Sequence, residues 1–262
     1  MALLHRIFNT FAYVLFLWFN LRALLSISDE PEYNNYYGSH ATYLTPAPWA
    51  FAIWGLIQLL FGGFVIWQWL PGTEEIVRHG FNVWFIVAAA FSSIWFVLWE
   101  ENYLVLALVV LVLATGAVSI IYFHLANLYP SQSPAQTLFV HAPVSLWHGW
   151  LVFVFWLNLL AIFTTVNDPV HPDWIHTLVV LLVIVHLAIT SMAYTQYKSQ
   201  YGDLPGAFAV IWALAAVGAH QAAVSIHYSA FIAVVVVVLY ALGQPARARY
   251  LASNAETRPL LG

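Results

Sequence analysis

Cysteine is absent from the 262 residues of the chain, and Lys198 is the only lysine. The absence of cysteine removes disulfides, iron–sulfur clusters and thiolate zinc sites from the structures that the chain could form. A retinal Schiff base needs a lysine deep within a bundle, whereas Lys198 lies at the end of an apolar segment. We therefore do not expect the chain to carry retinal.

Charged residues are also scarce. They make up 7% of the chain against 63% hydrophobic residues, whereas a soluble domain carries about a quarter charged residues. The apolar runs are nearly continuous, which favours helices over a membrane β-barrel. A net charge of −4 with seven Lys and Arg leaves no basic surface for nucleic acid. The sequence predicts an all-α, polytopic transmembrane helical bundle whose main partner is the lipid bilayer.

Long apolar segments separated by turn residues define the expected spans, since about 20 residues cross the hydrocarbon core. The first segment is too long for the core of a signal peptide. A seven-span alternative stays open, because only a few residues around Ser225 separate the last two segments. We expect one transmembrane domain over residues 1–243, a cytosolic polar tail over 244–262, and eight spans at 7–27, 47–70, 81–99, 103–125, 140–165, 174–196, 205–224 and 228–243.

Basic residues are distributed unevenly between the two ends of these spans. Cytosolic ends are enriched in Lys and Arg, and with the N-terminus in the cytosol six of the seven basic residues fall on that side. Arg22 is the exception, and its long side chain could reach lipid headgroups from the outer end of the first span. Both termini are therefore predicted to be cytosolic.

Several tryptophans fall inside the expected spans, away from the interfacial belt that usually holds them. Core packing explains such residues, and so does an aromatic wall around a pocket for a flat hydrophobic ligand. Both interpretations stay open for Trp54, Trp95, Trp150, Trp156 and Trp212.

Histidines also occur within or beside the spans. His186 lies near the middle of one span, where an ionisable group marks a functional site if it faces the bundle interior. A neutral imidazole bonded to a neighbouring helix is the alternative. His141 and His148 share one helix face, with His124 at the same depth, so a metal or haem site is a further alternative. The sequence predicts no cofactor, with haem or porphyrin left open.

Four stretches occur in an order that resembles the tryptophan-rich sensory proteins, the TspO/MBR-related group. The second stretch resembles the group's Trp-containing helix-pair junction, and the third its helix with Pro, Ser and Gly-Trp. The stretches are TPAPWAFAIWGLIQLL from Thr45, SSIWFVLW from Ser92, PVSLWHGWLVFVFWLN from Pro143, and YGDLPGAFAVIWAL from Tyr201.

The resemblance implies a helical membrane protein with an aromatic-lined cavity for hydrophobic ligands, which in five-helix members include porphyrins and sterols. Gln58 stands where a Tyr is usual and Ser92 where an Asn is usual. Gly149 would let another helix approach closely. By position, the resemblance gives roles to Pro48, Phe51, Trp54, Trp95, Pro143, Ser145, Gly149, Trp150, Asp203 and Trp212.

Together these observations predict a TspO/MBR-like binding or sensory protein whose ligand resembles a porphyrin, sterol or isoprenoid. The alternative is a secondary transporter, with His186, Asn158 and Gln221 along a polar path. A membrane haem protein or terpene cyclase-like enzyme is less favoured, because no acid lies in the middle of a span. The predicted ligand-binding residues are Trp54, Gln58, Trp95, Ser145, His148, Trp150, Asn158, His186 and Trp212.

The C-terminal tail ends in Glu256-Thr257-Arg258-Pro259-Leu260-Leu261, which resembles an acidic dileucine sorting signal. Such a signal works only on a cytosolic tail, where the charge distribution places it. In a eukaryote it would favour recognition by a sorting adaptor and an endosomal or vacuolar membrane. An arbitrary end without a signal is the alternative.

Overall fold

The structure, a computed structural model, describes residues 2–28, 40–197 and 202–256, and in these ranges all regular structure is helical. The predicted all-helical bundle is confirmed. Short 3-10 (η2) and π-helical (η3, η4) turns begin or join several of the α-helices. The elements are α1 (Ala2–Ser28), η2 (Pro48–Phe51), α2 (Ala52–Trp67), η3 (Ile76–Phe81), α3 (Trp84–Glu100), α4 (Leu104–Asn127), α5 (Pro134–Gln136), η4 (Thr137–His141), α6 (Ala142–Phe163), α7 (Trp174–Gln196), α8 (Leu204–His220) and α9 (Val224–Glu256).

A helix lies at each position where a span was expected. In the described part of the chain, five helices are long and apolar enough to cross a membrane, at 48–67, 104–127, 134–163, 174–196 and 224–244, and α3 and α8 are shorter apolar helices. α8 ends at His220, and α9 begins at Val224 and packs back against α8. The last two segments are therefore two helices and not one broken helix. α9 continues to Glu256, so the predicted tail begins as a helix, while residues 257–261 of the dileucine segment lie outside the described residues.

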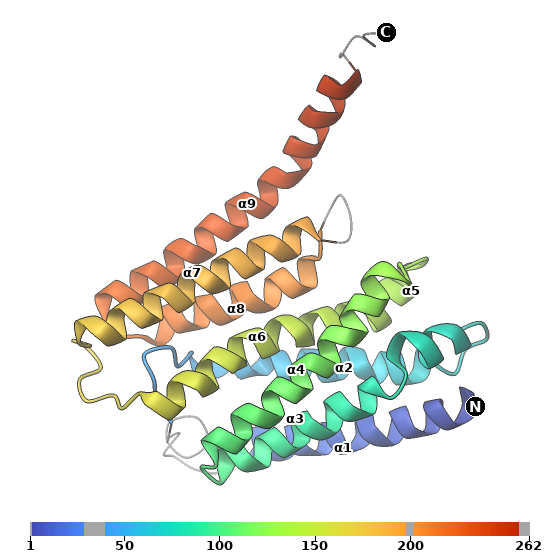
Figure 1. The fold of residues 1–262 in the computed structure, drawn as a ribbon, viewed down its shortest axis with the longest axis horizontal. Coiled ribbons are helices and arrows are strands. Elements are labelled where there is room, and N and C mark those ends of the chain that lie inside the picture. Colours follow the sequence, from blue (N-terminus) through green and yellow to red (C-terminus); the bar gives the residue numbers. More distant parts are fainter. Residues whose placement is uncertain (1, 29–39, 198–201, 257–262) are drawn as a thin grey trace.

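The helices form two groups that meet where α6 packs against α8 (Figure 1). In the first group α1, α2, α6, α4 and α3 form a ring in which each helix packs against the next and α3 packs against α1. In the second group α7, α8 and α9 pack against one another. A Cβ on Gly149 would lie only 2.5 Å from the carbonyl oxygen of Gly206. This confirms the expectation that Gly149 permits a close approach between helices.

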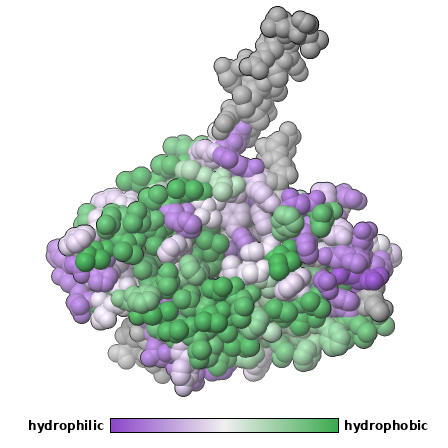
Figure 2. Space-filling view, viewed as in Figure 1, coloured by the Kyte–Doolittle hydropathy of each residue, from purple (hydrophilic) through white to green (hydrophobic). Residues whose placement is uncertain are grey.

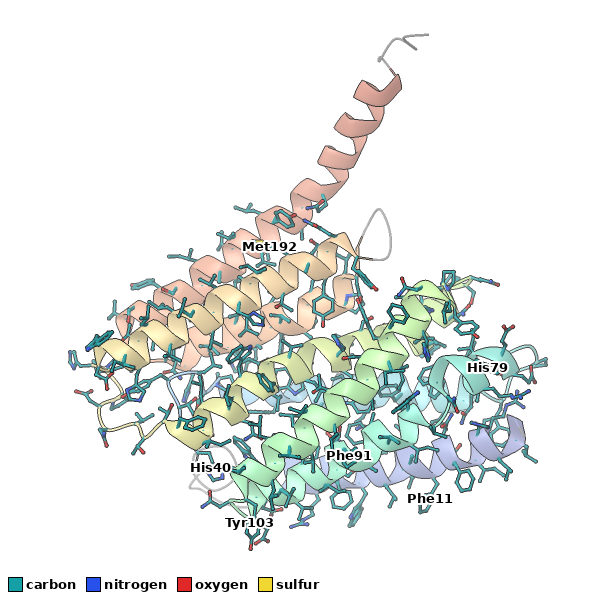
Figure 3. The ribbon with its side chains drawn as sticks, viewed as in Figure 1. Phe11, His40, His79, Phe91, Tyr103 and Met192 are labelled. Atoms are coloured by element: carbon teal, nitrogen blue, oxygen red, sulfur yellow. The ribbon has the colours of Figure 1, made fainter. Side chains whose placement is uncertain are left out.

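Two residues identify the ends of the five-helix ring. Figure 3 shows His79, on η3, and Tyr103, in the turn between α3 and α4, at opposite ends. The His79 end is the predicted cytosolic end, and the Tyr103 end is the predicted outer end. At the Tyr103 end Arg22 pairs with Glu100 at 2.9 Å. A carboxylate on the neighbouring helix therefore holds Arg22, where a lipid headgroup was expected.

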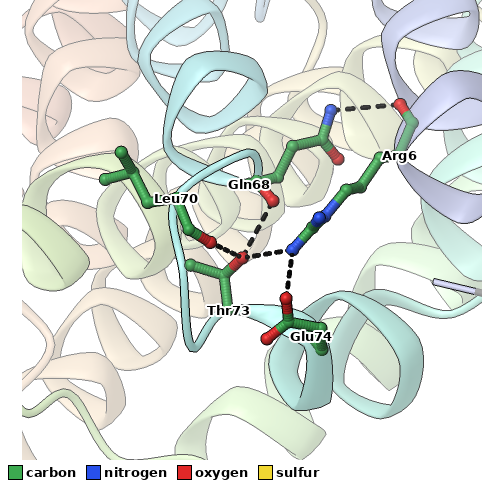
Figure 4. A network of polar contacts seen from close by, with 5 residues as sticks. All are labelled: Arg6, Gln68, Leu70, Thr73 and Glu74. Carbon is green, nitrogen blue, oxygen red and sulfur yellow. Dashed lines mark hydrogen bonds and ion pairs between the residues drawn. The ribbon is translucent and has the colours of Figure 1, made fainter. Parts of the chain in front are cut away.

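A polar network at the His79 end joins the start of α1 to the turn after α2 (Figure 4). Arg6 donates from Nη2 to Glu74 Oε1 at 2.8 Å and to Thr73 Oγ1 at 3.1 Å. The buried Gln68 side chain donates to the Arg6 carbonyl oxygen at 3.1 Å. The hydrogen bond from the backbone N–H of Glu74, and after it that from the Arg6 side chain, lower the pKa of the Glu74 carboxyl.

Much of the outer surface is apolar. Figure 2 shows hydrophobic residues over a broad part of the visible face, with hydrophilic residues mainly toward the two ends. Leu59, Ile66 and Phe163 are each more than 70% exposed. Water would penalise such a surface, whereas lipid tails accept it. The helices thus form a membrane bundle with an aromatic interior.

Candidate ligand-binding site

A continuous column of aromatic rings runs along the inside of the five-helix ring. Helical periodicity places Trp54 and Phe61 of α2 on one inward face, and Trp147 and Trp150 of α6 on another. Successive ring centroids lie 4.2–6.3 Å apart. The aromatic column consists of Phe81, Phe64, Phe61, Trp147, Phe16, Trp54, Phe96, Trp95 and Trp99, in order from the His79 end to the Tyr103 end.

Trp150 forms a branch from the middle of the column. Its ring meets Trp54 edge-on at 6.4 Å and also contacts Phe51 and Phe153. Trp54 and Trp150, both predicted as ligand-binding residues, therefore lie together. Edge-to-face contacts of this kind stabilise an aromatic core beyond the burial of the rings.

Several polar atoms beside the column are buried without a hydrogen bond. The Nε1 atoms of Trp54, Trp147 and Trp150, both amide atoms of Gln58, and the hydroxyl of Ser92 have no partner among the described residues. Gln58 is 3% exposed and lies one helical turn after Trp54. Each buried polar group without a partner costs about 1–3 kcal/mol. Such a group in a native fold needs an explanation, such as an unseen water or ligand.

Trp95 and Asn158 form a satisfied polar contact near the Tyr103 end. The indole N–H of Trp95 donates to Asn158 Oδ1 at 3.0 Å, and Asn158 Nδ2 donates to the Leu104 carbonyl oxygen at 3.0 Å. Asn158 therefore links α3, α4 and α6. This geometry is that of a structural hydrogen bond within the core.

A second polar cluster lies outside the column, between the two helix groups. Tyr122 donates its hydroxyl proton to Asp203 Oδ2 at 2.5 Å, and its ring stacks on His148 with centroids 4.8 Å apart. His148 also contacts the hydroxyl groups of Ser119 and Tyr194. Asp203 caps the N-terminus of α8, where its side chain accepts from the backbone N–H of Gly206.

Two cavities flank this cluster. One, of about 300 Å³, is lined by Asp203, His141 and Ser145. The other, of about 210 Å³, is lined by Tyr122, His148 and Tyr194. The predicted residues Ser145 and His148 thus line cavities away from Trp54 and Trp150.

The model of one protein family, described as TSPO-like protein, matches residues 6–243 of the chain. The chain belongs to the TSPO-like protein family. No curated protein and no solved structure matches it. The family match and the apolar helices make this TSPO-like chain an integral membrane protein, and they confirm the resemblance drawn from the four sequence stretches.

Besides Ser145 and His148, two more predicted residues of the TSPO-like chain lie outside the aromatic column. His186 is exposed on α7, where its ring meets Trp156 of α6 edge-on at 5.3 Å. Trp212 donates its N–H to the Ala50 carbonyl oxygen at 2.8 Å and packs on Trp49. The structure therefore brings Trp54, Gln58, Trp95, Trp150 and Asn158 to the column or its end, and places Ser145, His148, His186 and Trp212 elsewhere.

The predicted transport path has no counterpart in these contacts. Asn158 bonds to α3 and α4, Gln221 donates to the Thr42 and Thr45 carbonyl oxygens, and His186 lies on the outer face of α7. The three side chains thus have separate surroundings. The histidines also diverge, because His124 contacts the Gly80 carbonyl oxygen while His148 joins the tyrosine cluster. Within the described ranges, no group of three or more His, Cys, Asp or Glu residues could hold a metal ion.

Sequence reasoning missed several residues of these sites. Trp147 is completely buried at the centre of the column, and its spacing of seven from Val154 and three from Trp150 was an available signal of a shared helix face. Phe16 gave no distinct signal, because it lies within the apolar run from Phe11 to Phe19. Tyr122 and Tyr194 gave no local signal, because their partners are distant in the sequence.

Proposed function

We propose that this TSPO-like protein binds a flat hydrophobic ligand within the five-helix ring, beside Trp54, Gln58 and Trp150. The observation that supports the proposal is the buried amide of Gln58, which has no partner among the described residues and lies one helical turn from Trp54. The indole N–H groups of Trp54, Trp147 and Trp150 are also buried without a partner there. A bound ligand would supply the missing partners. Without such a partner, these buried polar atoms would only lower the free energy of unfolding.

The chemistry of the unpaired atoms limits the ligand. An indole offers only a donor, whereas the Gln58 amide offers both a donor and an acceptor. The ligand would therefore carry acceptor atoms, such as ring nitrogens or carbonyl oxygens, on a flat apolar frame that stacks on the aromatic rings. A porphyrin-like molecule fulfils these conditions best, and a sterol or isoprenoid with a single polar group fulfils them less fully.

An apolar groove between α1 and α3 would give such a ligand access from the lipid. The groove has a volume of about 400 Å³ and is lined by Ala12, Leu15 and Ala89, among other apolar residues. Ala12 shares a face of α1 with Phe16, one turn apart, and Phe16 belongs to the aromatic column. A small displacement of α1 would connect the groove with the column.

Titration of the full chain in lipid nanodiscs with protoporphyrin IX tests the proposal. We expect saturable quenching of tryptophan fluorescence. Gln58→Leu should weaken binding roughly tenfold, since one lost hydrogen bond is worth about 1.4 kcal/mol at the upper end. Trp212→Phe is the matched control, because its indole is bonded to Ala50 outside the column, and it should leave the affinity unchanged. Quenching without saturation, or equal affinity of Gln58→Leu and the native chain, would contradict the proposal.

A further inference from the structure

A cavity of about 210 Å³ lies between α4, α6 and α7, where the first helix group meets the second. Tyr122, Tyr194 and Tyr197 supply aromatic walls, Val152 supplies an apolar surface, and His148 and Thr190 are the other polar residues there. Phe123 and Ile189, beside the cavity, are more than half exposed. The cavity therefore opens sideways toward lipid, and its ligands would come from the membrane.

The hydrogen bonds behind this cavity have a defined direction. Ser119 donates its only hydroxyl proton to the Thr115 carbonyl oxygen at 2.7 Å. Its oxygen must then accept from His148 Nε2, 2.9 Å away. When His148 is neutral, the proton on Nε2 leaves an acceptor at Nδ1, and the Tyr194 hydroxyl then donates to His148 Nδ1. In each of these three hydrogen bonds, the donated proton points away from the cavity.

The Tyr194 oxygen is consequently an acceptor at the cavity wall. Its proton is committed to His148, and among the described residues no donor reaches its lone pairs. Hydrogen bonds aligned in this way polarise one another, which strengthens the acceptor at the end of the chain. A molecule that bonds to it must bring a hydrogen-bond donor.

We propose that this cavity is a second binding site, which takes the hydroxyl group of a membrane-dissolved alcohol. The hydroxyl of the alcohol donates to Tyr194 Oη, and the adjacent carbons pack between the rings of Tyr122 and Tyr197. An ether or ester of the same length has acceptors only, and would face the Tyr194 oxygen without a bond. At Tyr194 the site therefore favours a hydrogen-bond donor over an acceptor, independently of the ligand proposed for the aromatic column.

The remainder of the alcohol has a path along α6 and α7. The cavity is smaller than the ~300 Å³ at the low end for whole drug-sized ligands, so it suits a head group and not an entire lipid. Val152 and Trp156 follow His148 at four-residue steps on α6, and His186 precedes Thr190 by four residues on α7. Trp156 and His186 are in contact. An alkyl chain would run from Tyr194 toward this pair, so the exposed His186 lies at the far end of the proposed site.

Photolabelling of the full chain in nanodiscs tests the proposal. The probe is a long-chain primary alcohol with a diazirine on its chain, with dodecan-1-ol and dodecyl methyl ether as competitors. Mass spectrometry should locate the label on residues around Val152, Thr190 and Trp156. Dodecan-1-ol should compete at a concentration three- to tenfold lower than the ether, as expected for one hydrogen bond of about 0.5–1.5 kcal/mol.

Two variants test the direction of the hydrogen bonds. Tyr194→Phe keeps the ring and removes the acceptor, so the two competitors should become equal. Ser119→Ala frees His148 to carry its proton on Nδ1, which would turn the Tyr194 hydroxyl proton toward the cavity and shift the preference toward the ether. Ser93→Ala is the matched control, since Ser93 also bonds to the carbonyl four residues earlier but lies on α3.

Equal competition by alcohol and ether in the native chain would overturn the proposal, as would an unchanged preference in Tyr194→Phe. If Tyr194→Phe does not fold, Ser119→Ala decides the question, and a preference equal to that of Ser93→Ala would overturn the proposal. Failure of porphyrin binding at the column would leave all of these outcomes unaffected.

Discussion

Trp95 and Asn158 share a hydrogen bond of 3.0 Å in the buried core, while the Gln58 amide, equally buried, has no partner among the described residues. The two amides differ in consequence. Asn158 satisfies a donor on α3 and an acceptor on α4, and so contributes to the fold. The unpaired Gln58 amide costs the fold free energy, and the proposed ligand would offset that cost.

Asn158→Leu should destabilise the protein by about 2 kcal/mol, because it leaves the Trp95 N–H buried and unpaired. Thermal unfolding in detergent, followed by circular dichroism at 222 nm, measures the effect. Trp95→Phe removes the donor too, so the double variant should cost less than the sum of the single variants. Additive costs would show that the hydrogen bond contributes little.

Gln58→Leu should have the opposite effect on the ligand-free protein. Replacing an unpaired buried amide with an apolar side chain of similar size removes a desolvation cost of about 1–3 kcal/mol. We expect a higher unfolding temperature than that of the native chain under the same conditions. A lower unfolding temperature would mean that the amide has a structural partner, such as a bound water, and would remove the main support for the ligand site.

The positions of the helices were predictable because each apolar segment is long and ends at turn residues. Which face of each helix points into the bundle was harder to predict. A helix in lipid is apolar on every side, so hydrophobic periodicity does not separate the core from the lipid face. This is why the sequence left open whether His186 faces the bundle, and the structure shows it exposed on α7. It is also why Trp147 was overlooked beside His148.

The clusters of distant residues were beyond sequence reasoning for another reason. Tyr122 and Asp203 are 81 positions apart, and their pairing depends on how α4 packs near the start of α8. By contrast, Trp54 and Gln58 were placed on one face because they are one helical turn apart. Local spacing was therefore informative, whereas contacts between helices required the structure.

Gly149→Ala should destabilise the contact between α6 and α8. The added Cβ would lie 2.5 Å from the Gly206 carbonyl oxygen, closer than packed atoms allow, and overpacking of this kind costs about 1–3 kcal/mol. Gly116→Ala is the control, because nothing lies within 4 Å of the corresponding Cβ. In that helix interior alanine should stabilise by about 0.5–1 kcal/mol. Equal unfolding temperatures for the two variants would contradict the close approach.

The start of α7 should loosen at low pH. Asp173 caps the helix, and the backbone N–H and side chain of His176 lower the pKa of the Asp173 carboxyl. A lowered pKa in the folded state means that the stabilisation is complete above the ordinary Asp pKa of about 3.9 and is lost as the pH falls through the lowered value. Amide-exchange protection at His176, corrected for the intrinsic exchange rate, should fall below about pH 4. Asp173→Asn, which caps without titrating, should remove this dependence.

Single-cysteine variants can determine the orientation of the bundle, because the native chain has no cysteine of its own. Glu101→Cys places one thiol at the Tyr103 end, and His79→Cys places one at the opposite end, both at exposed positions. The distribution of basic residues predicts that the His79 end is cytosolic. For a protein in the plasma membrane of intact cells, a membrane-impermeant maleimide should label only Glu101→Cys. Permeabilisation should make His79→Cys reactive as well, and labelling in the reverse order would invert the predicted topology.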